Sequence, residues 1–93
     1  MEKELIRLYR FLFGLTQSEL SRECGMSQPW IHQFENGNKE LETPSLILIA
    51  RSLGLDPSAL GVGATDDEVR NTALEAVTHW LTEVGLSVQD KPV

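Results

Sequence analysis

Apolar residues recur along most of the chain at the three- to four-residue spacing of amphipathic helices. No run of alternating apolar and polar residues is long enough for a convincing strand. The pattern therefore predicts an all-α fold. Helices are expected over residues 2–13, 16–24, 27–36, 43–53 and 65–84, with one more short turn at residues 56–60.

Capping residues mark the expected helix starts. The T-x-x-E spacing of a capping box occurs twice, at Thr16 with Glu19 and at Thr65 with Glu68. Ser27 and Thr43 are the expected N-caps of the third and fourth helices, each with a proline in the first turn. The first four helices are expected to stop before a glycine, which readily adopts the left-handed turn after a helix.

The length of the chain suits a single compact domain. Ninety-three residues, 41% of them apolar, form one core, because a chain of this size buries only about 60% of its unfolded surface. Residues 1–60 are the expected compact unit. The small residues "GVGA" at 61–64 indicate a short hinge, residues 65–85 an additional C-terminal amphipathic helix, and residues 86–93 a flexible tail.

Charge is spread unevenly over the chain, whose formal net charge is -6. Residues 1–61 carry six Lys or Arg against eight Asp or Glu, and residues 62–93 carry two against six. A domain that only neutralised phosphates would be basic. Composition alone therefore argues mildly against a nucleic-acid partner, and the motifs have to be weighed against it.

The single cysteine, Cys24, excludes an intramolecular disulfide and fits a reducing cytoplasm. The first ten residues alternate charged and apolar positions, so they lack the apolar run of a signal peptide and the roughly 20 residues needed to span a bilayer. The sequence predicts a soluble, cytoplasmic protein without a membrane partner.

The helix over residues 27–36 has an apolar side and a polar side. On a helical wheel Ile31 and Phe34 lie together, which leaves an uncharged polar face at Pro29, His32, Gln33 and Asn36. The preceding helix buries Leu20 and Cys24, and "GMS" around Gly25 joins the two. Two short helices joined in this way are typical of a helix-turn-helix, whose second helix can enter the major groove of DNA.

These residues resemble a known family, the phage repressor and Cro type of helix-turn-helix, also called the XRE family. The resemblance covers roughly residues 5–60. It depends on "GLTQSEL" at 14–20, Ser21, Gly25, "SQPWIHQFENG" at 27–37 and "LIARSLGL" at 48–55. It implies a five-helix, lambda-repressor-like DNA-binding domain over residues 1–60 and a DNA-binding regulator of transcription.

The resemblance also implies roles for single residues. Gln17 matches a position that binds a DNA phosphate at the start of a helix. Gln28 and Gln33 match positions that read base edges, and a glutamine can donate to and accept from adenine together. Asn36, Gly37 and Asn38 match a segment that holds the sugar-phosphate backbone through side chains and main-chain amides. Arg10 and Glu35 match a partly buried ion pair.

Other residues around this segment have less specific roles. Pro29 and His32 lie on the same exposed face and are expected to contact bases. Lys39 is an expected backbone contact, and Arg22 a rim contact, because the face has few cations. We therefore expect a shallow salt dependence of DNA binding. Trp30 either contacts DNA at the rim or, as the wheel slightly favours, packs against the fourth helix.

Two apolar surfaces need partners. If Arg10 meets Glu35, then Ile6 and Phe13 face the helix-turn-helix, and a separate stripe is left at Leu5, Leu8 and Leu12. The last helix has a wide apolar face at Val69, Ala73, Ala76, Val77, Trp80 and Val84. The two surfaces can meet within one chain or across the two-fold axis of a homodimer, and we expect a mixture of both.

The sequence thus favours a prokaryotic transcriptional regulator without a cofactor or metal, most simply a repressor that binds an inverted repeat as a homodimer. The alternative is an antitoxin-like or other protein-interaction module, whose acidic C-terminal helix engages a partner protein. An enzyme is disfavoured, because neither His32 nor His79 is linked to Cys24 or to a serine in a pattern of nucleophile and base.

Overall fold

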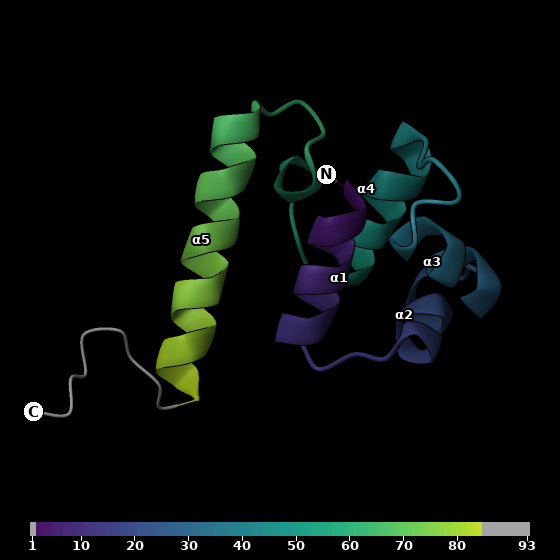
Figure 1. Ribbon diagram of the computed structural model, residues 1–93, viewed down its shortest axis with the longest axis horizontal. Helices are drawn as coiled ribbons and strands as arrows, with labels where there is room; N and C mark the ends of the chain where they lie inside the picture. The colour runs from purple at the N-terminus through teal and green to yellow at the C-terminus, as the bar shows by residue number, and fades with distance from the viewer. Residues whose placement is uncertain (1, 85–93) are drawn as a thin grey trace, which may run out of the picture.

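The computed structural model describes residues 2–84, with side chains from Lys3 onward, and within that range it contains helices and no strands. The expected tail at residues 86–93 lies outside the described residues. The elements are α1 (Glu2–Leu12), α2 (Gln17–Cys24), α3 (Gln28–Glu35), α4 (Thr43–Ser52), the 3-10 turn η1 (Pro57–Leu60) and α5 (Asp66–Glu83). The fold is all-α, as the sequence predicts (Figure 1).

Both capping boxes are present. Thr16 Oγ1 accepts a hydrogen bond from the Glu19 amide at 3.0 Å, and Thr65 Oγ1 accepts one from the Glu68 amide at 3.2 Å. The expectation for α4 is wrong by one residue, because the N-cap is Glu42 and Thr43 already lies in the helix. Ser27 is the N-cap of α3 but makes no side-chain capping bond.

One core joins all six elements. Its buried members, which come from each element in turn, are Leu5, Ile6, Tyr9, Leu20, Cys24, Ile31, Phe34, Leu46, Ile49, Ala50, Leu53, Ala59, Leu60 and Val69. Because α2 and α3 contribute four of these residues over only two turns each, their positions depend on packing against α1 and α4 more than on helix propensity.

The inward side of α1 differs from the expected one at Phe13. Ile6 is buried as predicted, but Phe13 is 47% exposed, and Tyr9 takes the inward position with no exposed surface. Phe13 lies beyond the end of α1 and stacks on Tyr9 with 6.2 Å between ring centroids. Burial raises the pKa of Tyr9, whose hydroxyl has no hydrogen-bond partner among the described residues.

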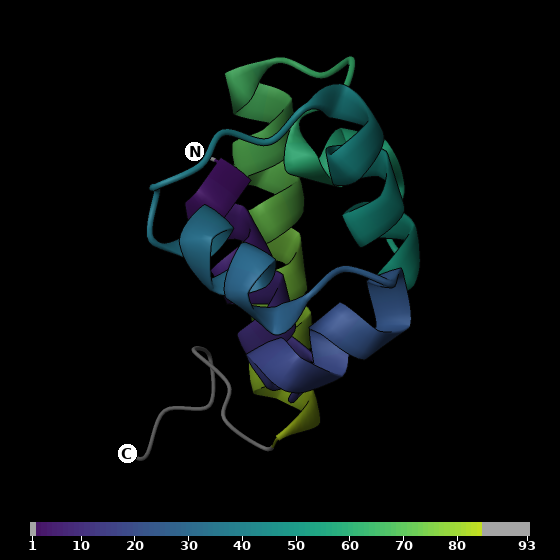
Figure 2. The same cartoon turned by 90° about the vertical axis from the view of Figure 1, so that its right-hand side faces the viewer.

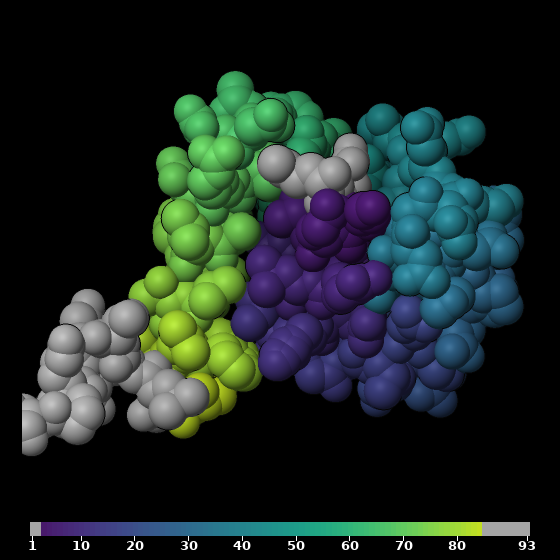
Figure 3. Space-filling model, in the orientation of Figure 1, coloured from purple at the N-terminus to yellow at the C-terminus, as the bar shows by residue number. Residues whose placement is uncertain are grey.

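Helix α5 lies along α1 on the side opposite α2 and α3, as the two ribbon views agree (Figures 1 and 2). Side chains of α1 fill the space between α5 and the rest of the molecule (Figure 3). Leu5 is buried, Leu8 and Leu12 are partly buried, and the Phe11 ring lies 5.5 Å from that of Trp80. Contact between the two helices is therefore made within one chain.

The apolar face of α5 is divided into two stripes. Val69 is buried, and Ala73 and Ala76 pack on the core, so these residues face inward, with Trp80 continuing the line. A second stripe at Leu74, Val77, Leu81 and Val84 is only partly covered: Leu74 is 58% exposed and Val84 50% exposed. Half of the apolar face therefore remains accessible.

Candidate nucleic-acid interface

Helices α2 and α3 form a helix-turn-helix at the surface of the molecule, in front of α1 in Figure 2. Gly25 ends α2 in the left-handed conformation, with φ of 70°, and its amide donates to the Ser21 carbonyl. The chain then reaches Ser27, the N-cap of α3. Ser21 is buried, and its hydroxyl donates to the Ser18 carbonyl at 2.7 Å. This bond satisfies the buried hydroxyl within α2.

The outward face of α3 has the composition expected from its sequence. Gln28, Pro29 and His32 are exposed, and Gln33 is partly exposed, while Ile31 and Phe34 are buried. No lysine or arginine lies on α3. The face can offer hydrogen-bond donors and acceptors to base edges but supplies no formal charge of its own.

Glu35 connects α3 to both preceding helices. Its carboxylate accepts bonds from Arg10 Nε at 2.7 Å and Arg10 Nη2 at 2.8 Å, which is the bidentate form of the expected ion pair. Gln17 Nε2 also donates to Glu35 Oε1, at 3.2 Å. Burial alone would raise the pKa of Glu35, but the hydrogen bonds and charges of its partners outweigh burial and lower it.

Gln17, the expected phosphate contact at the start of α2, thus already uses part of its hydrogen-bonding capacity within the protein. One hydrogen of its Nε2 points to Glu35, and the side chain is half-buried. An amide nitrogen has two hydrogens, so a second one remains for a phosphate oxygen. The bond to Glu35 holds the Gln17 amide in one orientation.

The expectation that main-chain amides after α3 hold the DNA backbone is not supported. The Asn36 amide donates to the His32 carbonyl at 3.0 Å, Gly37 to Phe34 at 3.1 Å and Asn38 to Gln33 at 2.9 Å. These bonds close the end of α3, as such amides commonly do. Only side chains of this segment, above all Asn36 and Asn38, remain for a ligand.

A chain of polar contacts crosses the end of α3. Arg7 Nη2 lies 3.5 Å from Asn36 Oδ1, and Asn36 Nδ2 lies 2.9 Å from His32 Nε2. Because an amide nitrogen donates, His32 Nε2 is the acceptor of this contact. The His32 ring and the Asn36 amide therefore hold each other in place on the exposed face.

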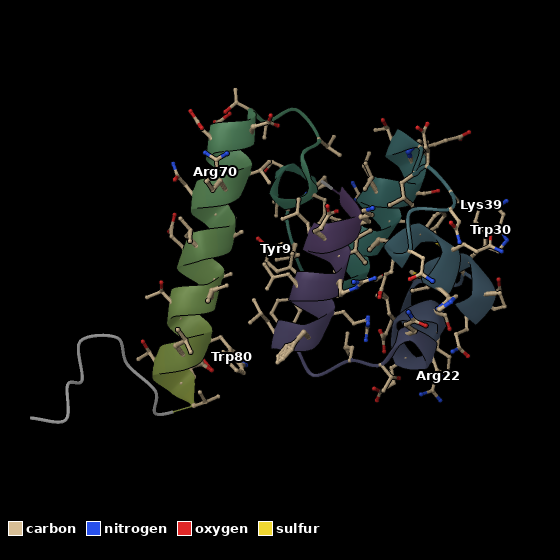
Figure 4. All side chains as sticks on the ribbon, viewed as in Figure 1. Tyr9, Arg22, Trp30, Lys39, Arg70 and Trp80 are labelled. Atoms are coloured by element: carbon tan, nitrogen blue, oxygen red, sulfur yellow. The ribbon has the colours of Figure 1, made fainter. Side chains whose placement is uncertain are left out.

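Trp30 and Lys39 form a pair at the edge of the same face (Figure 4). The Lys39 ammonium lies 4.3 Å from the centre of the Trp30 ring, within the range of a cation-π contact. Trp30 also meets Phe34 edge-on at 5.4 Å and is 47% exposed. These contacts do not support the preference for packing against α4. Arg22, in the last turn of α2, is exposed.

Two basic residues of α1 were missed by the sequence reasoning. Arg7 Nη2 donates to the Glu35 carbonyl at 2.8 Å, and Lys3 Nζ lies against the backbone of Gly37. The available signal was their spacing from Arg10, because positions 3, 7 and 10 share one side of a helix.

Nothing in the described residues assembles into a metal site, since no group of three or more suitable side chains is present there. Cys24 is buried, and burial raises the pKa of its thiol, which disfavours the reactive thiolate. His79 pairs with Glu83 on α5, with 2.6 Å between Nε2 and Oε1, whereas Cys24 lies in α2. No described helix is long and apolar enough to cross a membrane.

Comparison with known proteins agrees with this geometry. The family HTH_3, described as helix-turn-helix, matches residues 6–60. The chain therefore belongs to this XRE-type family of DNA-binding regulators of transcription. No curated protein matches the chain significantly.

Among solved structures, the chain is similar to the clp gene regulator ClgR from Corynebacterium glutamicum. The match has a TM-score of 0.63 and 21% sequence identity, and it covers 90% of this chain and 89% of that one. Because the match spans nearly the whole chain, the similarity in fold includes α5 as well as residues 6–60. At this identity the likeness concerns the fold alone.

Proposed function

We propose that the protein is a transcriptional repressor, which binds an inverted repeat in DNA as a homodimer and places α3 in the major groove. The observation that carries this proposal is the uncharged polar face of α3, held in one orientation by the contacts of Glu35 with Arg10 and Gln17. A fixed, exposed row of hydrogen-bonding side chains is what reading of base edges requires.

The proposed contacts divide into two kinds. Gln28 and Gln33 read bases, with Pro29 and His32 beside them on the same face. The backbone is held by side chains around this row, namely Gln17, Asn36, Asn38 and Lys39, with Trp30 and Arg22 at the rim. Lys39 supplies charge there, although its contact with the Trp30 ring restricts its reach.

The outer stripe of α5, Leu74, Val77, Leu81 and Val84, supports the homodimer. Its members recur at spacings of three, four and three residues, the pattern of a seam between two helices. Two of them are half exposed or more. Because α5 lies on the opposite side of α1 from α3, a two-fold axis at this stripe leaves the recognition face free for DNA.

The second candidate is an antitoxin-like protein whose C-terminal helix engages another protein. The first turn of α5 is acidic and exposed at Asp66, Asp67 and Glu68, next to the accessible stripe. Such a surface suits a basic partner protein as well as a second copy. The two candidates differ in whether the purified chain binds DNA specifically without a partner.

Selection of bound duplexes from random DNA tests the proposed function. The full chain should enrich an inverted repeat, with half-site centres separated by a whole number of helical turns of about 10–10.5 base pairs. Gln33→Ala should relax the preference at one position in each half-site, because it removes a donor and an acceptor from α3. Asn71→Ala, an exposed amide removed from α5, should select the wild-type repeat. Absence of enrichment at low salt would reject the proposal and favour the protein-interaction reading.

A further inference from the structure

The α1 face that meets α3 carries three cations in a row. Lys3, Arg7 and Arg10 are spaced four and three residues apart, so they lie on one side of the helix. The inner end of the row is the least exposed: the Arg10 side chain is 19% exposed and that of Arg7 57% exposed, and Lys3 is exposed as well. Arg10, at the inner end of the row, makes the closest ion pair with Glu35, and Arg7 lies farther from the same carboxylate.

Glu35 is bound closely by Arg10 and lies farther from Arg7, so it offsets the charge of the outer cations only in part. Both oxygens of its carboxylate already accept short bonds from Arg10, whereas Arg7 Nε lies 3.7 Å from Glu35 Oε1. Three cations against one carboxylate leave a net charge of +2 on this group of four residues. A guanidinium has five N–H donors, and the contacts of Arg7 with Glu35 and Asn36 do not use all of them.

The outer cations lie at the C-terminal end of α3. Arg7 Nη2 donates to the Glu35 carbonyl at 2.8 Å, and a Cβ on Gly37 would meet Lys3 Nζ at 2.9 Å. This end of a helix carries partial negative charge and repels a phosphate. The amides of Asn36, Gly37 and Asn38 cannot compensate, because they donate within the end of α3.

We infer that Lys3 and Arg7 bind a DNA phosphate beside the end of the recognition helix, together with the side chain of Asn36. This inference rests on the proposed function and names the source of charge that α3 itself lacks. Arg7 both offsets the negative helix end and presents the remaining donors of its guanidinium to the anion, and Lys3 adds a second charge next to Gly37.

Salt dependence of DNA binding tests this assignment. The full chain is titrated with the enriched inverted repeat, and with an unrelated duplex of equal length, over a range of salt concentrations. Each phosphate contact contributes about 0.9 to the slope of log K against log salt. Lys3→Gln with Arg7→Gln should reduce the magnitude of the slope by about 0.9 per protomer and weaken both duplexes by similar factors, because phosphates carry no sequence information.

Two control variants separate this role from others. Arg70→Gln removes the same charge from an exposed position on α5, opposite the interface, and should leave the slope within about 0.3 of the wild-type value (Figure 4). Arg7→Lys keeps the charge but loses the guanidinium, and should retain most of the slope. Thermal unfolding of each variant checks that the fold is intact.

The results distinguish the inference from the function on which it rests. If the wild type binds the repeat but the double variant keeps its slope, the assignment of Lys3 and Arg7 is wrong while the proposed function stands. If Arg70→Gln lowers the slope equally, the effect is one of net charge, and the assignment is again wrong. If the wild type binds neither duplex at low salt, both proposals fail.

Discussion

The carboxylate of Glu35 accepts hydrogen bonds from Arg10 on α1 and from Gln17 on α2, so one buried side chain joins three helices. Such a group is costly to bury unless every partner is in place. Removing Arg10 therefore affects both the stability of the fold and the orientation of α3.

Arg10→Ala should lower the free energy of unfolding by about 3 kcal/mol at pH 7, the lower end of the range for a buried pair, because Arg7 and Gln17 remain near Glu35. The pKa of Glu35 lies below its ordinary value of about 4.5 in the fold, so its contribution is present above that pH and is lost as pH falls through the lowered pKa. The two stabilities should converge as the pH falls through this lowered pKa.

Urea unfolding at pH 7 and pH 3 measures this difference. Arg70→Ala is the matched control, because Arg70 and Asp67 form an exposed pair with side chains 63% and 85% exposed. It should cost less than about 0.5 kcal/mol at either pH. A cost for Arg10→Ala that is independent of pH would show that Glu35 is not the titrating partner.

Resemblance to a family located the Arg10–Glu35 pair, because both residues stand in a recognisable motif. It did not locate Lys3, Arg7 or Tyr9, whose roles depend on how α1 is rotated against α3 and the core. A helical wheel of α1 gives the relative directions of side chains but not the direction of the neighbouring helices. Phe13 was misplaced because it lies beyond the end of α1, where a helical wheel no longer gives the direction of a side chain.

The two capping boxes stabilise helices with different tasks. Thr16 opens α2, whose first residue is Gln17, and Thr65 opens α5, whose first buried residue is Val69. In both boxes, bonds to the threonine lower the pKa of the glutamate, Glu19 or Glu68.

Helix starts were predictable because caps depend on local sequence. The start of α4 was misplaced by one residue because Glu42, an uncommon cap, occupies that position without a side-chain bond.

Thr16→Ala and Thr65→Ala should each lower the free energy of unfolding by about 1 kcal/mol, because each leaves an amide of the first turn without its acceptor. Only Thr16→Ala should also weaken DNA binding, since it loosens the turn that carries Gln17. Denaturant unfolding and titration of the enriched duplex check the two effects. Serine at either position should restore stability, and equal losses of DNA affinity in the two alanine variants would contradict the role given to Gln17.

At the scale of the whole molecule, the sequence predicted that α5 and α1 would meet, but it could not separate covered from accessible positions on α5. That division depends on where the core ends: Val69, Ala73 and Ala76 lie against the core, while Leu74 does not. The apolar pattern of a helix is the same whether its partner belongs to the same chain or to another.

Leu74→Glu should convert the proposed homodimer to a monomer, because it places a charge in the accessible stripe of α5. The fold should persist, since Leu74 is 58% exposed in the single chain. Size-exclusion chromatography with light scattering gives the mass, and Asn71→Glu is the control on the polar side of the same helix. A chain ending at Gly63 is less suitable, because it removes the buried Val69. An unchanged mass for Leu74→Glu would exclude this stripe as the dimer contact.

The position of α5 opposite α2 and α3 also makes the charge of the molecule asymmetric. The acidic first turn of α5 lies on one side of α1, and the cations of α1 that meet α3 lie on the other. In the field of a nucleic acid such a molecule experiences a torque that turns its less acidic side toward the polyanion before contact. The net charge of -6 therefore slows the approach of the protein to DNA less than the magnitude of this charge implies. It also disfavours encounters in the wrong orientation.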